Sequence, residues 1–271
     1  MNLSLQKTHP LLDEELVTTM ADYLMILRAE IAYGYAARSC GGRTVMEVGC
    51  NTGFCTGVIA RTAKKVFALD VNEAALSYAK EHHAADNVEY ILVDGKTFPA
   101  LEPRPDVAVF FQLIEHIEDD GRFLEDVSVA IAPAGKVIFT TPNAKLRLRP
   151  GQAPWNPFHV REYAYEDLQT LLKGRFSSYE IYGVFGIPAV HAQEKARVEQ
   201  TWWKRQVVDR YRERTGHFSV RAKLRKTFGI GAASEPVFDL QQAKATYGEG
   251  SFFLSRDNLP DALDFLVIAQ K

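Results

Sequence analysis

The stretch VMEVGCNTGFC, residues 45–55, decides the fold of this 271-residue chain. It reads as a short buried strand that runs into a glycine turn, and the small residues after the turn begin a helix. Gly49 and Gly53 allow the backbone to approach a ligand closely, and the start of the helix offers free N–H groups. A turn of this kind predicts a binding site for the polar part of a nucleotide-like ligand.

The rest of the chain continues this alternation of strand and helix. Short apolar runs, many of them rich in valine, are separated by helical segments, and Asn72 is expected to cap the helix after the second strand. The pattern is typical of a parallel sheet covered on both faces, and the right-handed crossover rule favours a doubly wound, Rossmann-like α/β sheet. Seven strands are expected, at residues 44–49, 65–71, 88–94, 106–114, 135–143, 177–186 and 262–271.

Four regions are predicted along the chain. A helical cap comes first, followed by the sheet-forming core, a basic helical insertion or lid, and the last strand of the core. Their residues are 1–42, 43–186, 187–250 and 251–271.

The insertion carries an unusual charge. Residues 195–226 contain eleven lysines and arginines against three acids, whereas the whole chain carries a net charge of −2. This local excess of positive charge is explained either by a solvated lid helix or by contact with an anionic partner, such as an acidic saccharide, a lipid-linked phosphate or a membrane surface. The negative charge of the remaining chain disfavours nucleic acid.

Acidic residues near the glycine turn narrow the choice of ligand. Asp70 ends the second strand, where a carboxylate can accept hydrogen bonds from ribose hydroxyls, and Asp94 ends the third strand, where it can receive an adenine amino group. Glu47 lies in the first strand. Asn51 occupies the middle glycine position of the dinucleotide fingerprint, so the fit to pyrophosphate is poor. Carboxylates suit a positively charged ligand without phosphate, which favours S-adenosylmethionine over a nicotinamide dinucleotide.

The motifs together resemble those of class I S-adenosylmethionine-dependent methyltransferases. The resemblance rests on VMEVGCNTG (45–53), ALDVNEAAL (68–76), ILVDGKTFP (91–99), FFQLIEHIED (110–119) and GKVIFTTPN (135–143). It implies S-adenosyl-L-methionine as cofactor, with the methionine end near the glycine turn and Gln112, the ribose at Asp70, and the adenine near the ends of the second and third strands. The cofactor-binding residues implied are Glu47, Gly49, Asn51, Gly53, Asp70, Val71, Asp94, Gly95 and Gln112.

Two histidines are candidates for catalysis. Methylation of a hydroxyl benefits from a base that removes its proton, and histidine is suited to this at neutral pH. His116 follows the fourth strand, and His159 lies in the loop that leaves the fifth. The segment NPFHVREYAYEDLQTLL (156–172) resembles bacterial methyltransferases that modify sugars or surface polysaccharides. This implies an O-methyltransferase of polysaccharide biosynthesis with His159 as general base, and Arg161 and Glu162 as substrate-binding or loop-ordering groups.

No metal is expected. The pattern IEH…TPN…H resembles the small-RNA 3′-end methyltransferases, which bind a metal through two glutamates and two histidines. Here Gln112 stands where their first glutamate would be, and the loss of one carboxylate weakens a site for a hard cation.

Cysteine usage and hydropathy bear on the compartment. The three cysteines, at positions 40, 50 and 55, form no disulfide framework, and no apolar run has the ~20 residues that span a bilayer. A cytoplasmic protein is expected. Three alternatives to an O-methyltransferase remain open: a nicotinamide-dependent oxidoreductase, an RNA methyltransferase, and a methyltransferase-like protein that binds the cofactor only as a scaffold.

Overall fold

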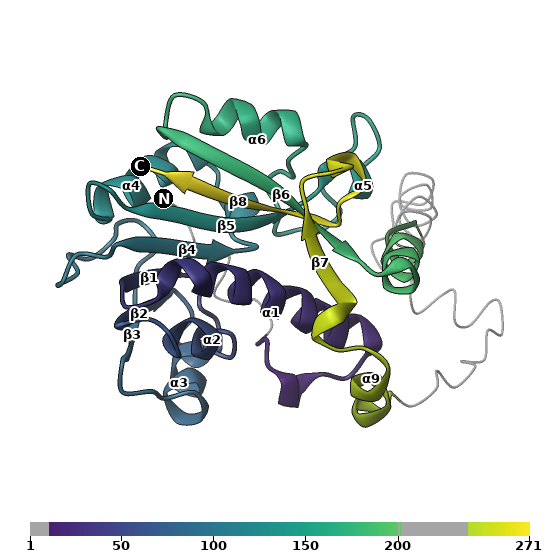
Figure 1. Cartoon of the computed structure of the whole chain (residues 1–271), viewed down its shortest axis with the longest axis horizontal. Coiled ribbons are helices and arrows are strands. Elements are labelled where there is room, and N and C mark those ends of the chain that lie inside the picture. Colours follow the sequence, from purple (N-terminus) through teal and green to yellow (C-terminus); the bar gives the residue numbers. More distant parts are fainter. Residues whose placement is uncertain (1–10, 200, 202–237) are drawn as a thin grey trace, which may run out of the picture.

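The computed structural model describes residues 11–199, 201 and 238–271 (Figure 1). An eight-stranded sheet crosses the molecule in the order β3-β2-β1-β4-β5-β8-β6-β7. Its strands are β1 (Thr44–Val48), β2 (Lys65–Asp70), β3 (Val88–Leu92), β4 (Val107–Phe111), β5 (Lys136–Pro142), β6 (Ser178–Gly186), β7 (Phe252–Ser255) and β8 (Asp264–Gln270).

β1 is the central strand of the parallel part of the sheet. It pairs with β2 on one side and with β4 on the other, and β3 and β5 extend the two sides in parallel. All five residues of β1 are buried. The chain moves outward from β1 to β3 and then returns to β4, so the strand order reverses between β1 and β4. In sheets of this kind a ligand crevice opens at the carboxyl ends of the strands beside that reversal.

Helices cover both faces of the sheet, and the period of two along each strand sorts its side chains between them. Val45 packs with residues of α1, α2 and α3, whereas Met46 packs with residues of α4 and α6. Figure 1 shows α1, α2 and α3 on one side of the sheet and α6 on the other. The α-helices are α1 (Met20–Cys40), α2 (Thr56–Ala60), α3 (Glu73–His82), α4 (Asp120–Ala130), α5 (Ala144–Arg147), α6 (Tyr165–Leu172) and α9 (Leu240–Thr246).

The expected doubly wound α/β fold is confirmed, and so is the cap of α3. The side chain of Asn72 accepts hydrogen bonds from the backbone N–H groups of Ala74 and Ala75. The expected number of seven strands was wrong, because β7 forms an eighth. β7 has only four residues, FFLS, of which only Phe252 is buried, so its apolar run is shorter than those by which the other strands are recognised. It exists because β6 offers it an antiparallel partner.

The sheet is also not parallel throughout. β8 pairs antiparallel with both β5 and β6. The last strand, β8, therefore lies between β5 and β6 and runs in the opposite direction to both. The direction of β8 cannot be predicted from the alternation of strands and helices, because the insertion, and not a simple crossover helix, precedes this strand.

Only part of the predicted cap and insertion falls within the described residues. Residues 188–199 are helical, and the buried side chains of Val190 and Ala243 join the same core cluster as α1. Most of the predicted basic segment, residues 200 and 202–237, lies outside the described residues, so its interpretation as a lid stays a prediction. Of the helices that the structure describes, none has both the length and the apolar character required to cross a membrane.

Candidate active site

A cavity of about 680 Å³ opens beyond the carboxyl ends of β1, β2, β4 and β5. Its base is formed by the glycine turn after β1 and by residues at the ends of the three neighbouring strands. Side chains of α1 and of residues 11–17 line one wall, and residues 147–159 line the opposite wall. This is the place where an open α/β sheet is expected to bind its ligand.

The glycine turn is held in shape by its own hydrogen bonds. Gly49, Asn51 and Gly53 all have positive φ angles, of 79°, 50° and 75°. The N–H groups of residues 49–53 each have an acceptor within the turn or on β2: Leu69 O for Gly49 and Cys50, Asp70 Oδ2 for Asn51, Asn51 Oδ1 for Thr52, and Cys50 O for Gly53. These five N–H groups are therefore not free and do not form a pyrophosphate site, and the helix whose start was expected to offer free N–H groups begins at Thr56.

Asp70 joins the turn to the start of α3. Its Oδ2 accepts from the N–H of Asn51 and its Oδ1 from the N–H of Asn72, both at 2.8 Å. The carboxylate is 8% exposed and lies on the cavity wall together with Asn72. Since a carboxylate oxygen can accept more than one hydrogen bond, Asp70 can hold the turn and receive ribose hydroxyls at the same time.

Asp70→Ala is expected to weaken the binding of S-adenosylhomocysteine about tenfold or more, because a hydrogen bond to a charged group contributes ~1.5–3 kcal/mol. Isothermal titration calorimetry measures this directly. Asp106→Ala is the matched control, since its carboxylate also accepts a backbone N–H, that of Thr44, but at the amino ends of the strands. Equal affinities for Asp70→Ala and the unaltered protein would remove Asp70 from the ribose site.

The other predicted cofactor residues are distributed unevenly around the cavity. Gly49, Asn51 and Gln112 line it, whereas Gly53, Val71, Asp94 and Gly95 do not. Asp94 is exposed, and its Oδ1 accepts from the N–H groups of Lys96 and Thr97. These hydrogen bonds hold the pKa of Asp94 below its ordinary value. Its contact with adenine stays a prediction.

Glu47 does not line the cavity, but it holds Tyr33, which does. Its buried carboxylate accepts a hydrogen bond from the Tyr33 hydroxyl at 2.5 Å, and the Tyr33 ring lies 4.1 Å from that of Phe111. Burial raises the pKa of Glu47 to about 7. Gln112 has a positive φ of 51°, and its side-chain amide donates to Thr140 Oγ1.

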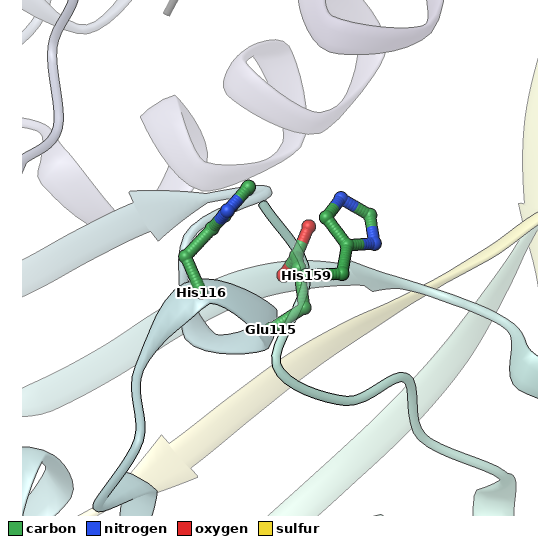
Figure 2. A group of neighbouring side chains, drawn as sticks. All are labelled: Glu115, His116 and His159. Atoms are coloured by element: carbon green, nitrogen blue, oxygen red, sulfur yellow. The ribbon is translucent and has the colours of Figure 1, made fainter. Parts of the chain in front are cut away.

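The two candidate catalytic histidines both line the cavity, and their rings lie close to each other (Figure 2). The short helix η3 (Ile114–His116) carries Glu115 and His116, and the loop with His159 is fastened to it by a hydrogen bond from Val160 N to Glu115 O at 2.8 Å. The two imidazole rings are nearly perpendicular, with centroids 4.7 Å apart. Residues 43 positions apart in the sequence are thereby brought into one group.

Each ring is oriented by an oxygen on its Nδ1 side. His116 Nδ1 lies 2.9 Å from the carbonyl of Phe158, and His159 Nδ1 lies 2.8 Å from Glu162 Oε1. Arg147 forms an ion pair with the other oxygen of Glu162, Nε to Oε2, at 2.9 Å. Burial alone would raise the pKa of Glu162, but the hydrogen bond from His159 and the charge of Arg147 hold it below its ordinary value. Glu162 is thus ionised and orients His159.

Glu115 completes the group. It is fully buried, and its Oε2 accepts a hydrogen bond from Thr141 Oγ1 at 3.0 Å. Its Oε1 has no hydrogen-bond partner among the described residues. Burial raises the pKa of Glu115 to about 8. One carboxylate oxygen of Glu115 and one nitrogen of each ring, His116 and His159, lie within 4.8 Å of one another.

The cavity is also lined by charged and aromatic residues that could not be placed there from the sequence. Arg28 of α1 forms an ion pair with Asp264 at the start of β8, with Nε 2.9 Å from Oδ2. The Arg147 guanidinium lies over the ring of Trp155, 4.2 Å from its centre. Arg28 and Asp264 are more than 200 residues apart, and only the packing of α1 against the sheet brings them together.

Comparison with known proteins identifies the family. A family model described as a methyltransferase domain matches residues 46–139. An S-adenosylmethionine-dependent methyltransferase of Mycolicibacterium smegmatis is 30% identical over 187 residues, which span 67% of this chain and 72% of the relative. The chain belongs to the S-adenosylmethionine-dependent methyltransferases. A Mycobacterium tuberculosis methyltransferase is 33% identical over 146 residues, 54% of this methyltransferase and 52% of the relative.

More distant relatives agree on the fold. A ubiquinone biosynthesis O-methyltransferase of Coxiella burnetii is 28% identical over 108 residues, 39% of this chain and 46% of the relative. The [4+2]-cyclase SpnF superposes with a TM-score of 0.53 at 16% identity, over 90% of this chain and 81% of its own. The Bacillus subtilis YcgJ protein superposes with a TM-score of 0.51 at 12% identity, over 89% and 97%. One of these neighbours is described as a cyclase, so the fold alone does not define the reaction.

The residues around the glycine turn fit S-adenosylmethionine, on which this family depends. The N–H groups of residues 49–53 are bonded within the protein, so the turn does not offer the anion-binding site that a pyrophosphate requires. Asp70 instead presents a carboxylate to the cavity. This donor set matches a ligand with ribose hydroxyls, a sulfonium and an ammonium, and no phosphate.

Proposed function

We propose that this methyltransferase transfers the methyl group to a hydroxyl of a small-molecule or glycan-type acceptor. The observation that carries the proposal is the orientation of His159 in the wall of the cavity. Its Nδ1 donates to the carboxylate of Glu162, which also pairs with Arg147, so the lone pair of the ring is on Nε2. A ring nitrogen of this kind can accept the proton of a hydroxyl as that hydroxyl is methylated. Methyl acceptors that react through nitrogen or carbon have less need of such a base.

The bound cofactor supplies an electrophilic methyl group on its sulfonium. His159 receives the hydroxyl proton at Nε2 as the oxygen forms its bond to that methyl carbon, and the electrons of the broken carbon–sulfur bond remain on sulfur. Glu162 stabilises the resulting imidazolium, and Arg147 keeps Glu162 in place. His116 packs against the same ring and is the second candidate for the base.

The wall next to this pair supports a polar acceptor. Trp155 and Asn156 line the cavity beside Arg147, so an aromatic surface and hydrogen-bonding groups lie together. A sugar ring has both an apolar face and many hydroxyls and would fit such a wall. The Coxiella burnetii relative is an O-methyltransferase, which also favours an oxygen acceptor.

His159→Ala is expected to lower turnover about 10²-fold or more and to leave the affinity for S-adenosylhomocysteine unchanged, because removal of a general base costs ~10²–10⁴ in rate. Radiolabelled methyl transfer to a panel of hydroxylated acceptors measures turnover, and calorimetry measures affinity. His82→Ala is the control, since His82 lies on α3 and does not line the cavity.

Two outcomes would contradict the proposal. Near-normal turnover of His159→Ala would return His159 to a structural role and leave His116 as the candidate base. A product methylated on nitrogen or carbon would exclude a hydroxyl acceptor, whatever the rate of the variant.

A further inference from the structure

We propose that Glu115, His116 and His159 form a binding site for a divalent cation of the Mn²⁺, Co²⁺ or Zn²⁺ class. Figure 2 shows the carboxylate of Glu115 between the two imidazole rings. The three residues each place one ligand atom within 4.8 Å of the others. Glu115 Oε1 is buried in this group and has no hydrogen-bond partner among the described residues.

The atoms of Glu115, His116 and His159 that face one another can all act as electron-pair donors to a cation. The Phe158 carbonyl can only accept a hydrogen bond, so His116 carries its proton on Nδ1, and Glu162, whose other oxygen pairs with Arg147, accepts from His159 Nδ1 in the same way. With the proton on Nδ1, the Nε2 atom of each ring can act as a ligand toward a cation, and so can the Glu115 carboxylate. A buried carboxylate oxygen without a partner is costly. A divalent cation would give this oxygen a partner.

The surrounding contacts resemble the outer shell of a metal site. A histidine that binds a metal usually donates its second ring N–H to a carboxylate or a backbone carbonyl, which fixes the ring and its tautomer. His159 and His116 do this with Glu162 and Phe158. The second oxygen of Glu115 is held by Thr141. The side chains are therefore oriented before any cation binds.

The donor set selects the class of cation. Two imidazoles and one carboxylate suit Zn²⁺, Mn²⁺, Fe²⁺ or Co²⁺, whereas Mg²⁺ and Ca²⁺ prefer oxygen ligands throughout. Three protein ligands leave coordination positions open for an acceptor oxygen. The expectation of no metal depended on Gln112, but the Gln112 amide is bonded to Thr140 and is not one of the three ligands. A glutamine at position 112 therefore does not weaken a site made of Glu115, His116 and His159.

A cation at this site would change how the acceptor is activated, and this consequence rests on the proposed function. A hydroxyl bound to the cation has a lowered pKa and releases its proton to water. The resulting alkoxide forms the new bond to the methyl carbon, and the electron pair of the carbon–sulfur bond stays on sulfur. His159 then acts as a ligand, and Glu162 orients it in that role as well.

The test is metal binding by the untagged, full-length protein after removal of metals with a chelator. Titration with Mn²⁺, followed by electron paramagnetic resonance of the free ion, is expected to give one ion per chain. Glu115→Gln and His159→Gln are each expected to weaken binding at least 10²-fold, and Glu162→Gln ~10–100-fold as an outer contact. Glu125→Gln is the control, because Glu125 is exposed on α4. Thermal melting of each variant checks that it is folded.

Absence of Mn²⁺, Co²⁺ and Zn²⁺ binding at millimolar concentration would overturn the cation site, and so would unchanged binding by folded Glu115→Gln. The outcomes also separate the site from the proposed function. Methylation of a hydroxyl at full rate in excess chelator would remove the cation and keep the proposed function. One bound ion per chain with methylation of a nitrogen would do the reverse.

Discussion

Gly53→Ala is expected to lower the free energy of unfolding by about 3 kcal/mol. Gly53 has a φ of 75°, which costs an L-residue ~1–3 kcal/mol. A Cβ atom there would also lie 2.4 Å from the Tyr90 hydroxyl oxygen. Tyr90 cannot move aside easily, because its hydroxyl donates to His83 O at 2.9 Å. Relieving such an overlap in a packed region costs a further ~1–3 kcal/mol. Urea denaturation measures the change.

Gly57→Ala is the matched control for this result. Gly57 lies in α2, four residues later, and a Cβ atom there has nothing within 4 Å. Alanine in a helix is favoured over glycine by ~0.5–1 kcal/mol, so this variant is expected to be slightly more stable. Gly53→Ala combined with Tyr90→Phe should recover part of the loss, since the closest atom is removed. A Gly53→Ala protein as stable as the unaltered one would contradict the described geometry of the turn.

The glycine turn also shows what the sequence could predict and what it could not. The pattern of a buried strand, glycines and small residues correctly placed the turn and the fold around it. It did not reveal where the N–H groups of residues 49–53 are directed, because Leu69 and Asp70 belong to the next strand and meet the turn only in the folded sheet. The conclusion against a pyrophosphate is now based on these contacts and not only on Asn51 at a glycine position.

The candidate catalytic group is a second example. The sequence singled out His116 and His159 by their places after the fourth and fifth strands, and the structure brings these two rings together. The place of Glu115 in this group was less clear from the sequence. The pattern IEH…TPN…H included this glutamate, but the sequence does not show that it is buried with an oxygen that lacks a hydrogen-bond partner among the described residues.

Long-range ion pairs and edge strands could not be predicted from the sequence, for a related reason. Arg28 and Asp264 are individually unremarkable in the sequence, and they pair only because α1 packs near the start of β8. β7 is too short, at four residues, to be recognised, and it forms because β6 offers a free edge. Local patterns report local structure and periodic burial, whereas these features arise from tertiary packing.

Glu47→Gln is expected to raise the free energy of unfolding at pH 8 by about 3 kcal/mol and to leave it nearly unchanged at pH 4.5. Burial raises the pKa of Glu47 from its ordinary value of 4.5 to about 7 in the folded protein. Between these values the unfolded chain ionises while the folded chain keeps its proton. The folded state then binds more protons, and stability falls by ~1.4 kcal/mol per pH unit. The contribution is complete below pH 4.5 and lost above pH 7.

The measurement is urea denaturation of the cofactor-free protein from pH 4.5 to 8, compared with Glu47→Gln, since the difference cancels the titration of other groups. Glutamine keeps an acceptor for the Tyr33 hydroxyl. Glu89→Gln on β3 is the control, because Glu89 is about half exposed in a surface ion pair with Lys65 and should show no such pH dependence. Tyr33→Phe should move the transition to higher pH, because the hydrogen bond from Tyr33 lowers the pKa of Glu47. Parallel pH profiles of the unaltered protein and Glu47→Gln would mean that Glu47 is ionised in the folded protein throughout. The sulfonium would then lie near a permanent negative charge beneath Tyr33.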